Sequence, residues 1–295
     1  MARPQGTAAT SAGAIRDRGY AMVLGIAATI LLVLLGNLVL ISPVVEFFSQ
    51  HSLYQQLRLT LAEGATPVAA VDKHNHLVEA GTPVAVMSAP GIGLGRTVIV
   101  QGTDAAQTME GIGHLRDTVM PCQAGSSVLM ARSGSYGAIG AKWAKLAPGD
   151  EFTMTMGQGT CIYRVLDQRL AGQAAPAPPS GSQGNLVLTT ALGRPFAPSG
   201  ILRVDATLVT SSYPASASVF PATSLPAQEN AMATDTTQLW PLVFLLQLVV
   251  ASVLVGVWMW RRWGRWQSWL VAGSVLTASA LAAAANIDLL LPNLM

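Results

Sequence analysis

Three long apolar segments constrain what this chain can fold into more than any other feature of its sequence. They cover residues 20–41, 240–260 and 269–291. Each has the length of about twenty residues that a helix needs to cross the hydrocarbon core of a membrane. The composition agrees, because 51% of the residues are hydrophobic and only 11% are charged. We therefore expect a membrane protein with three transmembrane helices in contact with the lipid bilayer.

The first apolar segment could also be a cleaved signal peptide. We favour a permanent helix, because the run is longer than the usual apolar core of a signal peptide and is followed by bulky residues instead of small ones. Residues 20–41 would then be the first membrane anchor.

Basic residues predict the orientation of the helices. Arg16 and Arg18 end the tail of residues 1–19, and three arginines lie in residues 261–268, between the second and third segments. Lys and Arg concentrate on the cytoplasmic side of a membrane, and Trp gathers at the level of the lipid headgroups. Five tryptophans surround the three arginines: Trp258, Trp260, Trp263, Trp266 and Trp269. We expect this tail and loop in the cytoplasm, and residues 42–239 and 292–295 outside the plasma membrane.

The extracytoplasmic part is predicted to be a β domain between two connecting segments. Leu53, Leu57 and Leu61 recur at helical spacing and predict a connector helix over residues 42–63. Residues 211–239 are rich in Ser, Ala, Pro and Thr and predict a surface linker with little fixed structure. Residues 64–210 alternate short apolar runs with Gly and Pro, which is typical of strands; the runs are residues 84–87, 97–100, 127–130, 152–156, 161–166, 186–190 and 202–209.

Several short motifs lie in the order and at the spacing of a known family. They are Gly111-Ile-Gly-His114, Gly125-Ser-Ser-Val-Leu-Met-Ala131, Leu146-Ala-Pro-Gly-Asp150 and Val187-Leu-Thr-Thr-Ala191. With these motifs the chain resembles the sortases, most closely the class E (housekeeping-type) sortases of actinobacteria. The resemblance implies a mainly β fold, an eight-stranded β-barrel with its active cleft between neighbouring strands. It also implies a cysteine transpeptidase.

The resemblance fails at the positions that carry the family's chemistry. The nucleophilic Cys of the family falls on Ala191, and its essential His falls on Arg132, whose guanidinium stays protonated. The family's Arg falls on Ile201 or, two residues on, on Arg203; both stay open, because residues i and i+2 of a strand share a face. His114 is not the family's catalytic His and could have a structural role instead. By resemblance, the candidates for lining a peptide cleft are His114, Ser133, Thr189 and Thr190.

The two cysteines are expected to be structural. Cys122 and Cys161 fall in predicted strands or at their edges, in a compartment where a disulfide can persist. They would form either a disulfide or two buried thiols. A reactive thiol would need a partner that lowers its pKa, and the sequence identifies none.

These observations lead to two hypotheses about function. The first is a membrane-anchored, sortase-like pseudoenzyme: a binding, scaffold or assembly subunit whose partners are other membrane or surface proteins and whose cleft holds a peptide ligand. The second is a divergent transpeptidase or hydrolase that processes surface proteins. It would need a nucleophile with a base in reach, and the candidates are Cys122, Ser133, Thr189 and Thr190 with His114 as the base.

Nucleic-acid binding and a cofactor are not expected. The net charge is only +2, and the sequence has no run of Lys and Arg that would form a basic stripe. His51, His74 and His76 lack the four well-spaced ligands of a metal site. Gly91-Ile-Gly-Leu-Gly95 lacks the Lys-Ser/Thr ending of a phosphate-binding loop and is expected to form turns.

Overall fold

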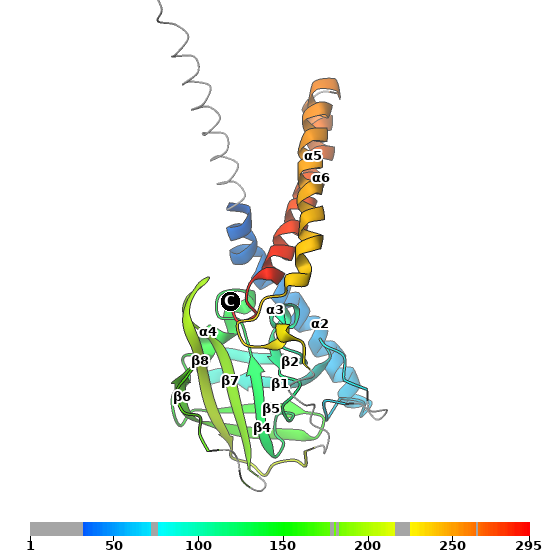
Figure 1. Ribbon diagram of the computed structural model, residues 1–295. Coiled ribbons are helices and arrows are strands. Elements are labelled where there is room, and N and C mark those ends of the chain that lie inside the picture. Colours follow the sequence, from blue (N-terminus) through cyan, green and yellow to red (C-terminus); the bar gives the residue numbers. More distant parts are fainter. Residues whose placement is uncertain (1–31, 72–75, 178–179, 181–182, 216–224, 264) are drawn as a thin grey trace, which may run out of the picture.

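The computed structural model describes residues 32–71, 76–177, 180, 183–215, 225–263 and 265–295. It consists of a β-barrel and of long helices that rise from one end of the barrel (Figure 1). The predicted tail of residues 1–19 and the first half of the first apolar segment lie outside the described residues. The last residues of the chain lie where the barrel meets the helices, at the mark C in Figure 1.

Eight strands form a closed barrel in the order β1-β2-β3-β4-β7-β8-β6-β5, which confirms the predicted fold class. The strands β2 and β3 are parallel, as are β4 and β7, and the other neighbours are antiparallel. The strands are β1 (Pro83–Ala89), β2 (Leu94–Gln101), β3 (Ile112–His114), β4 (Gly125–Met130), β5 (Glu151–Met156), β6 (Gly159–Leu170), β7 (Gly184–Arg194) and β8 (Ala197–Leu208).

Alternation along β7 and β8 separates the interior of the barrel from its outer face. Leu186, Leu188 and Val204 point inward and are fully buried in the main core. Each such side chain stabilises the fold by about 1.5–3 kcal/mol relative to leaving it exposed. Because neighbouring residues of a strand point to opposite faces, Thr189 and Ala191 lie on the outer face. This outer face carries the candidate site.

A disulfide joins Cys122, in the loop before β4, to Cys161 in β6. The two Cα atoms are 5.8 Å apart, and the residues are separated by 39 positions in the sequence. A loop of this size corresponds to about 4 kcal/mol of stabilisation in the chain-entropy model. Both residues are buried, so the bond fixes the loop before β4 from inside the barrel.

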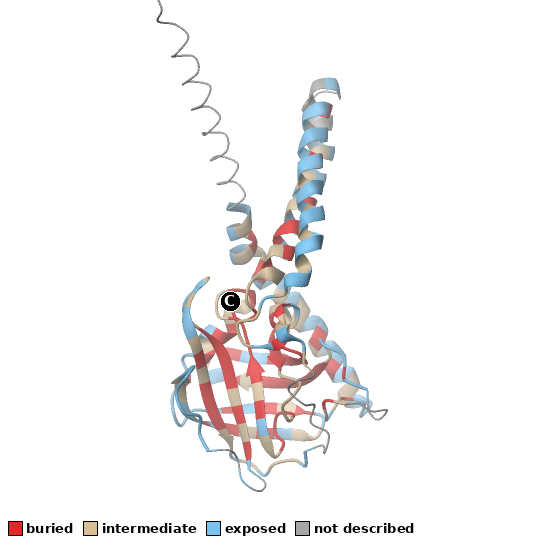
Figure 2. Ribbon diagram, in the orientation of Figure 1, coloured by how far each residue is buried: buried red, intermediate tan, exposed pale blue. Residues whose placement is uncertain are grey.

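Three helices are long and apolar enough to cross a membrane, as predicted: Leu32–Ala62, Thr236–Met259 and Leu270–Leu290. The first contains a π-helical turn, η1 (Asn37–Ile41), and continues into α2 (Ser42–Ala62). The other two overlap α5 (Leu239–Trp263) and α6 (Arg265–Leu290). Figure 2 shows that the surface of α5 is exposed along most of its length, as expected for a helix that faces lipid.

The second half of α2 packs on the barrel. Its Leu53 and Leu57 contact Val86, Val98 and Val100 of β1 and β2. The remaining short helices are α3 (Ala105–Glu110), α4 (Ile139–Trp143), η2 (Pro90–Ile92), η3 (Tyr136–Ala138), η5 (Ala227–Glu229) and η6 (Thr236–Gln238).

Two connecting segments differ from the predictions. The sequence predicts a loop over residues 261–268, whereas α5 runs to Trp263 and α6 begins at Arg265. Arg and Trp are tolerated in helices, and residue 264, between the two helices, lies outside the described residues. The predicted loose linker is docked on the barrel in its second half. There Glu229 is only 2% exposed and forms an ion pair with Arg116.

Candidate functional site

The pairing of β4, β7 and β8 brings the predicted degenerate positions together. The strands β4 and β7 are parallel, which places Arg132, just beyond the end of β4, beside Ala191. The strands β7 and β8 are antiparallel, with Ala191 directly opposite Ile201. Arg203 lies two residues farther along the same face of β8. Arg132, Ala191, Ile201 and Arg203 therefore lie together on one face of the barrel.

Arg132 is buried and fixed to backbone on both sides. Its Nη2 donates to the carbonyl oxygens of Ala105 at 3.1 Å and Asp288 at 3.3 Å, and its Nε donates to the Thr108 hydroxyl at 3.3 Å. The guanidinium lies 5.4 Å from the centre of the Tyr136 ring. Burial lowers the pKa of Arg132 to about 10, which leaves it charged at neutral pH. A cation at the carboxyl end of α6 also complements the helix dipole.

Asp288 connects the membrane helices to Arg132 and Tyr136. Its Oδ2 accepts a hydrogen bond from Asn37 Nδ2 at 2.7 Å and another from the Tyr136 hydroxyl at 2.8 Å. Burial and the contact with Asp288 raise the pKa of Tyr136, so its hydroxyl stays neutral and donates. Asn37 belongs to the first apolar helix, Asp288 to α6 and Tyr136 to η3. We call Asn37, Arg132, Tyr136 and Asp288 the junction cluster.

The segment that follows α6 covers the position of Ala191. Leu294 is fully buried and packs with Ala191, Met130 and Ile201. Its carbonyl oxygen accepts hydrogen bonds from the amide (3.0 Å) and the hydroxyl (3.3 Å) of Ser133. The outer face above Ala191 is therefore occupied by the chain itself.

The neighbouring Asn293 holds this segment in place. It is fully buried, and its Nδ2 donates to the carbonyl oxygens of Thr103 at 2.7 Å and Asn230 at 2.9 Å. Ser135 adds a hydrogen bond from its hydroxyl to the Met295 carbonyl at 2.8 Å. Buried amides that find several partners are costly to separate from them. Residues 292–295 are thus anchored on both sides of Leu294.

His114 does not line the cleft but is buried at the end of β3. Its Nδ1 lies 2.6 Å from Gln101 Oε1, and its Nε2 lies 2.9 Å from the Val119 carbonyl oxygen. The Thr118 hydroxyl is 3.2 Å from the same Nε2. The Thr118 hydroxyl donates to the Leu115 carbonyl oxygen at 2.7 Å, so its proton is already engaged with the backbone. Burial lowers the pKa of His114 to about 4, so the ring is neutral and holds the barrel wall together.

Of the remaining predicted cleft residues, Ser133 and Thr189 border the site and Thr190 does not. Thr190 is fully buried, and its hydroxyl donates to the Ala131 carbonyl at 3.0 Å. Thr189 lies on the outer face and is almost fully covered. Arg203 is half-buried and, within the part of the chain that the structure describes, its guanidinium forms no hydrogen bond or ion pair.

The site contains no thiol, because the two cysteines of the sequence are bonded to each other. Among the described residues, no group of three or more His, Cys, Asp or Glu side chains could hold a metal ion.

Sequence reasoning missed the junction cluster and the role of Leu294. One signal was present: Asp288 and Asn286 interrupt the apolar pattern near the outer end of the third segment. Ionisable residues within a membrane helix are energetically unfavourable, and they usually pair with another charged group or with backbone carbonyls. The partner, however, lies more than 150 positions away in the sequence and becomes visible only in the fold.

Known structures that resemble this chain are sortases. The Clostridium perfringens sortase D5 transpeptidase is 19% identical, with a TM-score of 0.44, over 56% of this chain and 99% of its own. Sortase A from Corynebacterium diphtheriae is 20% identical, with a TM-score of 0.40, over 57% and 86%. Sortase C-1 from Actinomyces oris is 26% identical, with a TM-score of 0.39, over 43% and 73%. No protein-family model and no curated protein matches the chain significantly.

Proposed function

We propose that this protein is a membrane-anchored, sortase-like pseudoenzyme that serves as a binding, scaffold or assembly subunit at the outer face of a plasma membrane. The observation that carries the proposal is the closed site: Ala191 stands at the nucleophile position of the resembled family and lies beneath the chain's own Leu294. A substrate carbonyl has neither a nucleophile nor room at this position.

The chemistry of the other candidate groups supports the same proposal. Acyl transfer of the sortase type needs a thiolate and an acid that protonates the leaving amine. Both cysteines are held in a disulfide, and Arg132 keeps its proton at neutral pH. The hydroxyl of Ser133 donates to a backbone carbonyl, and so does that of Thr118, the hydroxyl beside His114. The rival hypothesis of a displaced nucleophile finds no base here among the described residues.

A non-catalytic role fits the way in which the helices join the barrel. The junction cluster ties the first helix and α6 to the barrel, so the orientation of the barrel on the membrane is fixed. A fixed orientation presents the same surface to other membrane or surface proteins. A peptide ligand would bind either by displacing Leu294 or on the part of the outer face near Arg203 that Leu294 leaves uncovered.

The proposal is tested by incubating the full chain with sorting-signal peptides under conditions in which an active sortase cleaves them. We expect no cleavage, no transpeptidation and no acyl-enzyme detectable by mass spectrometry, because the chain offers no free thiolate. The active sortase serves as the positive control. An acyl-enzyme trapped reproducibly on the wild-type chain would contradict the proposal and direct attention to Ser133, Thr189 and Thr190.

The proposed topology predicts the accessibility of introduced cysteines. Gln173 is exposed on the barrel. The cysteine of a Gln173→Cys variant should therefore react with an impermeant maleimide added to intact cells. Gly264, between α5 and α6, should react as Gly264→Cys only after permeabilisation, because the arginines around it favour the cytoplasmic side. The native cysteines give no background, since they form a disulfide. The reverse labelling pattern would show that the barrel lies in the cytoplasm.

A further inference from the structure

The hairpin of β7 and β8 reaches from the barrel toward the membrane helices. The strands are 11 and 12 residues long and end in a turn at Pro195 and Phe196, with Arg194 paired to Ala197. Figure 1 shows that the tip of this hairpin rises on the same side of the barrel as α5 and α6 and ends at the level where α5 begins. We call residues 194–197 the hairpin tip.

An exposed tryptophan marks this level as the edge of the membrane. Trp240, in the first turn of α5, is 73% exposed. Trp at the end of an apolar membrane helix is typical of the headgroup region. A hairpin tip at the level of Trp240 therefore lies at the height of the lipid headgroups.

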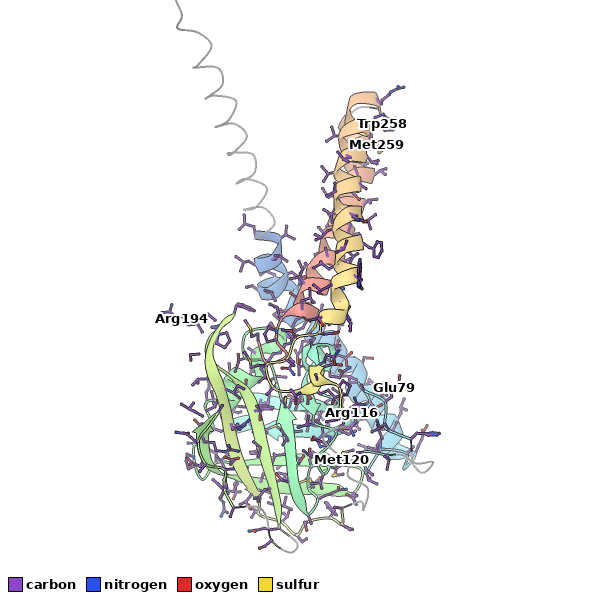
Figure 3. All side chains as sticks on the ribbon, viewed as in Figure 1. Glu79, Arg116, Met120, Arg194, Trp258 and Met259 are labelled. Carbon is purple, nitrogen blue, oxygen red and sulfur yellow. A yellow bond between two sulfur atoms is a disulfide. The ribbon has the colours of Figure 1, made fainter. Side chains whose placement is uncertain are left out.

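The side chains of the tip suit contact with lipid. Arg194 is exposed, and its guanidinium forms no hydrogen bond or ion pair with the described residues. Figure 3 shows it projecting away from the barrel. Phe196 has a left-handed backbone (φ 62°), which residues other than glycine rarely adopt, and its ring is only half-buried. Strain of this kind at a turn gives a reason to look for a function of the side chain.

The tip is also held firmly in this place. A Cβ atom on Gly134 would lie 3.3 Å from the Cα atom of Pro195, so the tip packs closely on the loop after β4. Ser133, the residue before Gly134, donates a hydrogen bond to the carbonyl oxygen of Leu294, which follows α6. The height of the tip is thus fixed relative to the end of α6.

We propose that the hairpin tip rests on the outer membrane leaflet, with the Arg194 guanidinium bound to phosphate groups of anionic lipids and Phe196 at headgroup level. A guanidinium binds phosphate through two parallel hydrogen bonds and is weakly hydrated, which suits this position. Together with the helices, the tip would give the barrel a second contact with the membrane and prevent it from tilting. The proposal requires only that the helices are inserted and is independent of whether the barrel is catalytic.

The test uses the full chain in nanodiscs that contain lipids with a quencher on the headgroup. A fluorophore on Ala197→Cys reports on the tip, and one on Ser126→Cys, exposed at the start of β4, reports on the opposite end of the barrel. The native disulfide leaves only the introduced thiol free to react. We expect strong quenching at position 197 and little at position 126.

The contribution of Arg194 is measured by comparing phosphatidylglycerol discs with phosphatidylcholine discs. The substitution Arg194→Gln should weaken the contact of the tip with the anionic discs by about fivefold, the effect of one basic residue near such a surface. Arg164→Gln, on β6, is the matched control and should have no effect. Equal quenching at positions 197 and 126 would overturn the proposal. Quenching that depends neither on Arg194 nor on lipid charge would also overturn it.

Discussion

Replacement of Arg132 by methionine is expected to lower the free energy of unfolding by about 3–5 kcal/mol, the usual cost of removing one member of a buried charged group. The Arg132 guanidinium donates hydrogen bonds to the Thr108 hydroxyl and the Ala105 carbonyl of α3 and to the Asp288 carbonyl of α6. The buried carboxylate of Asp288 lies close by. Without the guanidinium, these groups lose their partner while they stay buried. Thermal and denaturant unfolding of the full chain in mild detergent would measure the loss.

Arg164→Met is the matched control for this prediction. Arg164 forms an ion pair with Glu151, and both side chains are about half exposed. Exposed pairs contribute less than about 1 kcal/mol, so this variant should remain close to the wild type. Arg132→Lys should also be destabilised, because an ammonium cannot reach the same set of acceptors. Equal stability of the Arg132 and Arg164 variants would show that the junction cluster does not hold the barrel to the helices.

A cysteine introduced by Ala191→Cys is expected to be protected from thiol reagents as long as Leu294 covers it. Removing that cover with Leu294→Ala should cost about 2–4 kcal/mol of packing free energy. The population of the open site, and with it the rate of modification, should rise by about 30-fold or more, since about 1.4 kcal/mol corresponds to tenfold. Maleimide labelling followed by mass spectrometry would measure both rates.

Two controls accompany this experiment. Ser126→Cys is exposed and should react rapidly in both backgrounds, which excludes a general effect of Leu294→Ala on the fold. Unfolding curves of the double variant should show that the barrel remains intact. If Ala191→Cys reacted as fast as Ser126→Cys while Leu294 is present, the site would be open in solution and the proposal of a closed cleft would be wrong.

Much of the fold could be predicted from local patterns. The apolar runs of the three helices exceed what a soluble domain needs, so their type follows from length and composition alone. Seven of the eight strands contain runs of apolar residues long enough to show their pattern. The strand β3, Ile112–His114, has only 3 residues and no visible period, and it was recognisable only within a motif. The linker was misjudged because its composition is polar, whereas the ion pair of Glu229 with Arg116 docks it on the barrel.

For the candidate site, too, some features could be predicted from the sequence and others could not. That Ala191 carries no nucleophile and that Arg132 stays charged follow from the residue types, which the sequence states directly. That Ile201 and not Arg203 faces Ala191 depends on the strand register, which a shift of one or two residues would change.

The sequence alone therefore determined the membrane helices, the strands of the β domain and the residue types at the candidate site, because hydrophobic length, strand periodicity and side-chain identity are local properties. Only the tertiary structure decided what surrounds those residues. Leu294 covers Ala191, and Asp288 meets Arg132, Tyr136 and Asn37, across separations of 103 to 251 positions in the chain. No local pattern encodes such contacts, because they arise where the closed barrel and the end of α6 happen to bring distant residues within hydrogen-bond distance.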